Sequence, residues 1–240
     1  NNLPEGIVSL INGDYRVGEL LTQDTRVALI SATGSTRMGK IVGAAVAARL
    51  GRSLLELGGN NAIIITPEAD LKIVLTGAVF GAVGTAGQRC TTTRRLIIHQ
   101  SIFDKVTRAL VKAYKQIQIG NPLDPKNHMG PLIDIQAVYH YQKALEAIKN
   151  QGGKMLVQGG VLKGRKYGSG CYVLPCIAEV TNDLPIVQSE TFAPILYVMS
   201  YRTLDEAIQM QNNVPQGLSS AIMTNNMREA EQFLSAAGSD

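Results

Sequence analysis

The sequence contains no tryptophan, only 5% aromatic residues and only three cysteines in 240 residues. An odd number of cysteines in a chain of this length does not make a disulfide framework, and Cys171 and Cys176 lack zinc-site spacing with any partner pair. The histidines His99, His128 and His140 share no ligand spacing either. These absences argue against a disulfide-stapled secreted module and against a metal enzyme. They favour a reducing, intracellular compartment, which we take to be the cytoplasm.

Long apolar runs and a strong charge of one sign are also lacking. The longest apolar stretch, residues 73–83, is interrupted by a threonine and two glycines, and it is far shorter than the roughly 18 apolar residues that a membrane span needs. The formal charge is only +4, and the 23 basic residues are scattered except at 94–95 and 163–166. We therefore expect neither a membrane nor a nucleic acid as a partner.

Short β-branched and aliphatic runs alternate instead with longer helical patterns. The runs predict strands at residues 6–11, 27–31, 54–57, 62–65, 95–99, 154–157, 172–180, 195–200 and 220–224. Apolar residues that recur at three- and four-residue steps predict helices over 41–48, 102–117, 138–148 and 204–211. This alternation indicates an α/β fold with a mostly parallel sheet that is covered on both faces.

Capping residues and glycines locate the ends of some elements. Ser101 is expected to cap the helix over 102–117, with Asp104 placed as in a capping box. Thr203 is expected to begin the helix over 204–211. After the strand over 54–57 come two glycines and two asparagines, residues that tolerate positive φ and sharp turns. We therefore place a domain boundary there, between residues 1–57 and 58–240.

The segment Thr33-Gly34-Ser35 lies between a predicted strand and a predicted helix. Such a turn offers backbone N–H groups and the positive end of a helix dipole to a phosphate. Gly34 also begins a Gly-x4-Gly-Lys pattern, but Ile41 stands where a P-loop needs a hydroxyl, so we reject a P-loop. An ordinary turn with a capping serine or threonine explains the segment equally well.

Two further segments contain side chains that could take part in catalysis. Glu56 lies between leucines beside a double-glycine turn, where burial would raise its pKa and suit it to act as a general base. A solvated glutamate at a strand end is the simpler alternative. Cys90 follows a small-residue stretch and Arg89, and a neighbouring cation favours the thiolate that attacks carbonyls. A lone cysteine is more often a small buried hydrophobe.

Together, the Gly34-Ser35 turn, the Glu-Leu-Gly-Gly segment and a Gly-Gln-x-Cys segment, in this order, resemble the aldehyde dehydrogenase superfamily. Cys90 follows Glu56 by 34 positions. The segments at 121–133 and 189–194 are similar to a loop of the family's catalytic domain and to its Glu-x-Phe-x-Pro segment. The resemblance thus extends along essentially the whole chain. Within the superfamily, the sequence looks most like the branch that oxidises α-aminoadipic semialdehyde.

The resemblance implies a three-layer aldehyde dehydrogenase-like fold, in which 1–57 are the rear part of a Rossmann-like NAD(P)-binding domain and 58–240 a thiol-bearing α/β catalytic domain. It implies that Cys90 forms a thiohemiacetal and then a thioester with a small-molecule aldehyde, and that Glu56 activates the water that hydrolyses the thioester. NAD is the implied cofactor, and NADP is not excluded. The residues that match its binding positions are Gly34, Ser35, Leu57, Gly58, Glu190 and Phe192. Glu190 could instead cap a turn, and Phe192 could belong to the core.

Arg89 and Thr91, on either side of the thiol, are expected to contact the substrate. The guanidinium of Arg89 could pair with the distal carboxylate of a semialdehyde, or it could only tune the thiolate. By the same resemblance, the complete protein is expected to be a homo-oligomer.

The resemblance also implies that this sequence is a central part of a longer enzyme. The asparagine that would complete an oxyanion hole at Cys90 and the strands used in oligomerisation would lie outside it, so we expect the isolated chain to be inactive. Ala32 stands where the family usually has a larger apolar residue. Two alternatives remain, a non-catalytic nucleotide-binding or assembly module of the same fold and an enzyme that transfers the acyl group to coenzyme A.

Overall fold

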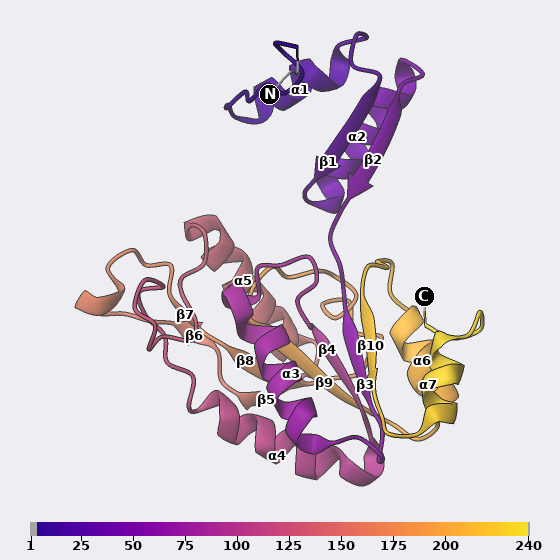
Figure 1. Cartoon of the computed structure of the whole chain (residues 1–240). Helices are drawn as coiled ribbons and strands as arrows, with labels where there is room; N and C mark the ends of the chain where they lie inside the picture. The colour runs from indigo at the N-terminus through magenta and orange to yellow at the C-terminus, as the bar shows by residue number, and fades with distance from the viewer. Residues whose placement is uncertain (1–3, 240) are drawn as a thin grey trace. The chain divides into compact units, whose positions relative to one another are not determined.

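The computed structural model describes residues 4–239. The chain divides into two compact units, Asn1–Gly58 and Gly59–Asp240. Figure 1 shows the helices and strands of each unit. Within residues 4–239, no helix is long and apolar enough to cross a membrane. The α/β class that the sequence predicts is confirmed in both units, since each contains parallel strands joined through helices.

The first unit consists of one helix followed by a strand-helix-strand motif. Its elements are α1 (Tyr15–Gln23), β1 (Leu29–Thr33), α2 (Thr36–Ala48) and β2 (Arg52–Glu56). β1 and β2 pair in parallel, with Thr33 opposite Glu56 in the register. The predicted strand over 6–11 is wrong, because the backbone turns at Gly6 with a φ of +82° and the following residues remain exposed without strand partners. Helix α1 was not predicted.

The second unit is built on a six-stranded sheet in the order β10-β3-β4-β9-β8-β5. Its strands are β10 (Ser220–Met223), β3 (Ala62–Ile65), β4 (Arg95–His99), β9 (Ile195–Tyr201), β8 (Cys176–Glu179) and β5 (Lys154–Val157). Every pairing is parallel except that of β5 with β8, as expected for a mostly parallel sheet. A separate two-stranded ladder joins β6 (Gly160–Val161) to β7 (Val173–Leu174).

Helices cover both faces of this sheet. They are α3 (Leu71–Val83), α4 (Phe103–Tyr114), α5 (Ile135–Asn150), α6 (Leu204–Asn212) and α7 (Met227–Leu234), with short 3-10 turns at Gly84–Gly87, Gln100–Ile102 and Arg165–Tyr167. The chain runs from β3 through α3 to its neighbour β4, but from β9 through α6 back past β4 and β3 to β10. Because parallel crossovers are right-handed, these opposite directions place α3 and α6 on opposite faces (Figure 1).

The core of this unit lies between the sheet and its helices. β3 is buried along its whole length, and so are the first four residues of β4 and nearly all of β9, as expected for strands covered on both sides. Thr203 caps α6 as predicted, because its side chain accepts a hydrogen bond from the Glu206 N–H. The capping box predicted at Ser101 is wrong. The N-cap of α4 is Ile102, whose apolar side chain makes no cap, and the hydroxyl of Ser101 lies 2.7 Å from Nδ1 of His99.

Candidate functional site

The thiol loop, residues 84–92, leaves α3 through a left-handed turn. Thr85, Ala86 and Gly87 have φ values of +51°, +55° and +71°. At Gly87 a Cβ atom would lie 2.4 Å from both the carbonyl carbon and the oxygen of Ala193, so only glycine fits. This turn brings the residues before Cys90 against the segment 189–194, where Glu190 and Phe192 lie.

Asn61 fixes the backbone on both sides of the thiol. Its Nδ2 donates to the carbonyl oxygens of Cys90 and Thr92 at 2.7 and 2.8 Å, and its Oδ1 accepts from the Ser219 N–H at 3.1 Å. Gly59 lies so close to this loop that a Cβ there would be 2.5 Å from the Cys90 carbonyl oxygen. The loop is therefore held by the start of β3, which comes about thirty residues earlier in the chain.

Cys90 itself is half-buried, whereas Cys171 and Cys176 are buried, and all three are free thiols. Burial raises the pKa of the Cys176 thiol, which keeps it protonated and unreactive. Of the three, Cys90 is therefore the thiol that a reagent or a substrate can reach. Thr91, beside it, is exposed.

Glu190 and Phe192 both contact Arg94, a residue that the sequence analysis did not select. The Glu190 carboxylate accepts hydrogen bonds from the Gly59 N–H and from Arg94 Nη2, each at 3.1 Å. The guanidinium carbon of Arg94 lies 5.4 Å from the centroid of the Phe192 ring. The turn-capping alternative for Glu190 therefore gains no support, and Phe192, which is 46% exposed, is not a core residue.

Arg94 is 1% exposed and also donates to the carbonyl of Arg89, which directly precedes the thiol. Burial lowers the pKa of its guanidinium, and the Glu190 carboxylate opposes that change. One sequence signal could have revealed this residue. Arg94 directly precedes the apolar run that forms β4, and a cation buried at such a place requires partners.

Arg89 points toward a pocket beside α3. Its guanidinium carbon lies 5.6 Å from the centroid of the Phe80 ring, and the side chain is exposed. The pocket has a volume of about 550 Å³ and is mostly apolar, with Val79, Phe80 and Val83 among the residues that line it. A substrate chain of several carbons with an anionic end would fit such a lining.

The first unit contains the other predicted site residues. Ser35 caps α2, since its Oγ accepts from the Met38 N–H at 3.1 Å, and the Gly34 N–H donates to the Glu56 carbonyl at 3.0 Å. The turn and Glu56 therefore lie at the neighbouring ends of β1 and β2. The expected burial of Glu56 among leucines is wrong, because its side chain is exposed in this structure and its strand is mostly exposed.

Leu57 packs closely on α2, where a Cβ at Gly39 would lie 2.4 Å from its Cδ2. Gly58 is the last residue of the unit. A cavity of about 860 Å³ lies between α1, β1 and α2, with Thr33, Arg37 and Met38 among the residues that line it. The first unit thus presents the capped turn and the Glu56 carboxylate at the neighbouring ends of its two strands, with the cavity along the length of β1.

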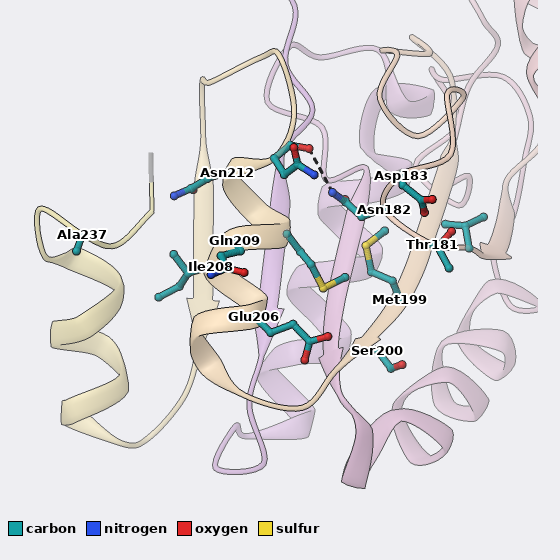
Figure 2. Close-up of a pocket in the computed structure, with 13 residues that line it drawn as sticks. Thr181, Asn182, Asp183, Met199, Ser200, Glu206, Ile208, Gln209, Asn212 and Ala237 are labelled. Atoms are coloured by element: carbon teal, nitrogen blue, oxygen red, sulfur yellow. Dashed lines mark hydrogen bonds between the residues drawn. The ribbon is translucent and has the colours of Figure 1, made fainter.

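A further cavity of about 790 Å³ lies in the second unit beside α6 and β9 (Figure 2). None of the predicted site residues lines it. The dashed line in Figure 2 joins Asn182 Nδ2 to the carbonyl of Asn213 at 3.2 Å. Among residues 4–239, no group of three or more His, Cys, Asp or Glu side chains could hold a metal ion.

The profile of the aldehyde dehydrogenase family matches residues 1–238. The chain is 45% identical over 240 residues to aldehyde dehydrogenase family 7 member B4 of Arabidopsis thaliana, and 49% identical over 241 residues to the α-aminoadipic semialdehyde dehydrogenase of Bos taurus. Both alignments cover all of this chain but 46% and 44% of those proteins, so the chain spans about half their length.

Among solved structures, betaine aldehyde dehydrogenase from Staphylococcus aureus in complex with NAD⁺ is similar, with a TM-score of 0.86 at 30% identity. The match covers 89% of this chain and 43% of that one. It confirms the aldehyde dehydrogenase-like α/β fold that the sequence motifs imply.

Proposed function

Because this chain belongs to the aldehyde dehydrogenase family, we propose that the protein containing it oxidises an aldehyde to a carboxylic acid with NAD(P) as the hydride acceptor and Cys90 as the nucleophile. The observation that supports this most is the environment of one thiol. Cys90 alone of the three cysteines is accessible, its carbonyl is fixed by Asn61, and the preceding residue shares Arg94 with Glu190.

The residues present fit a dinucleotide. The first turn of α2 contains no acidic residue and follows the Gly34-Ser35 turn, so its N-terminus suits a pyrophosphate. Glu190 could accept a hydrogen bond from a ribose hydroxyl, and Phe192 could contact the nicotinamide ring. Leu57 and Gly58 complete the set that we assign to cofactor binding. When bound, NAD⁺ supplies a two-electron acceptor for hydride.

Cys90 would act in two stages. Its thiolate adds to the aldehyde carbon, and the oxyanion that forms is held in part by the Cys90 backbone N–H. After loss of hydride the carbon is a thioester of Cys90. Glu56 then takes a proton from a water molecule that attacks this thioester, which releases the acid and restores the thiolate.

Substitution of the two groups tests this scheme separately. Cys90→Ala should abolish aldehyde oxidation and leave cofactor binding intact. Glu56→Gln should give a single burst of NADH, about one per site, and then stall as the thioester, which mass spectrometry detects on the Cys90 peptide. Unchanged turnover in Cys90→Ala would refute the proposal.

Acyl transfer to coenzyme A is the second candidate. Glu56 argues against it, because hydrolysis of the thioester needs a base to activate water and acyl transfer to coenzyme A does not. Product analysis with and without coenzyme A distinguishes the two. An inert Cys90, which NAD does not activate toward a thiol reagent, would instead favour the non-catalytic module.

For the substrate, we propose a semialdehyde with a distal carboxylate, such as α-aminoadipic semialdehyde, with Arg89 as the anion partner and Thr91 beside it. The support is the exposed guanidinium of Arg89 at a mostly apolar pocket, together with the similarity to relatives named for that substrate. Arg89→Ala should lower kcat/KM for the carboxylated aldehyde by about 10- to 100-fold, the size of a charge-assisted contact, and leave that for a neutral aldehyde of equal length nearly unchanged. Equal losses for both would contradict the assignment.

The assembly and compartment stay predictions. Free thiols at all three cysteines suit a reducing compartment such as the cytoplasm. Light scattering on the purified protein tests the expected homo-oligomer, and a monomer at all concentrations would contradict it.

A further inference from the structure

Arg94 connects segments that are far apart in the sequence. Its Nε donates to the Gly59 carbonyl at 3.3 Å, and its Nη1 donates to the Thr191 carbonyl at 2.5 Å. Its Nη2 donates to the Arg89 carbonyl at 3.3 Å and to Glu190 Oε1 at 3.1 Å. One guanidinium thus binds the start of β3, the residue before the thiol and the segment that contains Glu190.

The neighbouring arginine provides a comparison inside the same chain. Arg95 is 0% exposed, but it points to the other side of the strand, as successive side chains in a strand do. It donates to the Asn60 carbonyl, to Asn182 Oδ1 and to the carbonyls of residues 210 and 211. These partners include neither the thiol loop nor the segment of Glu190. The two arginines are equally buried, but only Arg94 reaches the candidate site.

The contacts of Arg94 restrict how Glu190 can lie. Oε1 of Glu190 is held by two donors, the Gly59 N–H and Arg94 Nη2. Within residues 4–239, Oε2 accepts no hydrogen bond, and the Glu190 side chain is 18% exposed. The carboxylate is therefore anchored by one oxygen and presents the other to a ligand. The Phe192 ring, two residues on, lies against the same guanidinium.

We propose that Arg94 is a positioning residue that fixes Glu190 and Phe192 for the cofactor and links them to the thiol loop through the Arg89 carbonyl. The proposal rests on the proposed function, because it assumes that Glu190 binds the cofactor ribose. Arg94 itself touches no reacting atom. Its role is to couple occupation of the cofactor site to the position of Cys90.

Removal of a charge with this role should weaken NAD binding more than removal of a buried charge that only stabilises the fold. We expect Arg94→Gln to raise the Kd and KM for NAD by about tenfold, the size expected when a charge-assisted contact that orients a ligand group is lost. It should also remove the acceleration by NAD of Cys90 alkylation. Arg94→Lys should recover part of both, since an ammonium keeps the charge beside Glu190 but cannot reach all the carbonyls.

Arg95→Gln is the matched control in the protein that contains this sequence. It removes an equally buried guanidinium from the next position of the chain, so it should lower the Tm like Arg94→Gln. Unlike Arg94→Gln, it should leave the Kd for NAD and the alkylation of Cys90 unchanged. Displacement of fluorescent NADH by NAD, steady-state kinetics and mass spectrometry of the Cys90 peptide measure these quantities.

A double-variant cycle separates the coupling from general damage. If Arg94 acts through Glu190, adding Glu190→Gln to Arg94→Gln should weaken NAD binding much less than Glu190→Gln does alone. An unchanged Kd in Arg94→Gln and Arg94→Lys, additive losses in the cycle, or an equal rise in Arg95→Gln would each overturn this role and leave the proposed function intact. If the unsubstituted protein binds no NAD(P), the proposed function itself fails, and this role fails with it.

Discussion

Gly87 is the position where a single methyl group should do the most damage to the candidate site. In Gly87→Ala the new Cβ would meet the carbonyl carbon and oxygen of Ala193 at 2.4 Å and the nitrogen of Pro194 at 2.7 Å. All three are backbone atoms, so no side-chain rotation relieves the contact. The φ of +71° adds strain, because alanine is disfavoured in the left-handed region.

The expected cost has two parts. The left-handed backbone costs alanine about 1–2 kcal/mol, and overpacking against fixed backbone costs about 1–3 kcal/mol more. The free energy of unfolding of the second unit should therefore fall by roughly 2–5 kcal/mol, which lowers the Tm by about 2–4 °C for each kcal/mol in a domain of this size. The segment that contains Glu190 and Phe192 lies directly before the clash, so NAD binding should weaken too.

Gly84, at the other end of the same turn, is the control. A Cβ there would meet only Phe80 Cε2 at 3.9 Å, and its φ is −52°, which alanine adopts freely. Gly84→Ala should stay within about 0.5 kcal/mol of the unsubstituted protein, as is usual away from special sites. Urea unfolding followed by far-UV circular dichroism compares the two. Equal stability of the two variants would refute the argument that Ala193 and the left-handed turn require glycine at Gly87.

Two further predictions concern the loop and the core. Asn61→Ala leaves the carbonyls of Cys90 and Thr92 without their donor, so the free energy of unfolding should fall by roughly 2–4 kcal/mol and the alkylation rate of Cys90 should change. Asn61→Asp should restore only the acceptor for the Ser219 N–H. An unchanged alkylation rate in Asn61→Ala would contradict the idea that Asn61 fixes the loop. Burial raises the pKa of Tyr114 and of Tyr141 far above 10, so above that pH the unfolded state binds fewer protons than the folded state and stability falls. The slope of the free energy of unfolding against pH should be about 3 kcal/mol per pH unit for these two tyrosines. The part of the tyrosinate absorbance that a Tyr114→Phe, Tyr141→Phe variant lacks should rise together with unfolding, and a rise of that part before unfolding would contradict the prediction.

Much of the fold was predictable where local signals agreed. β3, β4 and β5 occupy the predicted residues, because each is a short apolar or β-branched run bounded by turn residues. The run at 6–11 has the same composition but no neighbouring strand to pair with, and composition alone does not show that. The hydroxyl of Ser101 contacts His99 rather than the helix, which is a local competition that a capping pattern does not reveal.

In the candidate site, the motif residues were predicted because their order and spacing resemble those of a family. Arg94 was not predicted, because its contacts are with Gly59 and Glu190, which are 35 and 96 positions away. No periodicity or local motif encodes such contacts. The exposure of Glu56 was missed because its neighbours in the sequence are misleading. The leucines beside it predict burial, but its strand is mostly exposed.

The order of strands in the second unit has a consequence for how the protein is made. β3 lies between β4 and β10, so one neighbour follows it by about 30 residues and the other by about 155. A ribosome adds roughly 5–20 residues per second, so Glu190 leaves it on the order of 10 s after Gly59, to which it must bind. For that interval the nascent chain contains Cys90 and Arg94, but not the segment whose Glu190 carboxylate pairs with Arg94. Chaperone contacts with the nascent chain should therefore concentrate between the synthesis of β4 and that of β9.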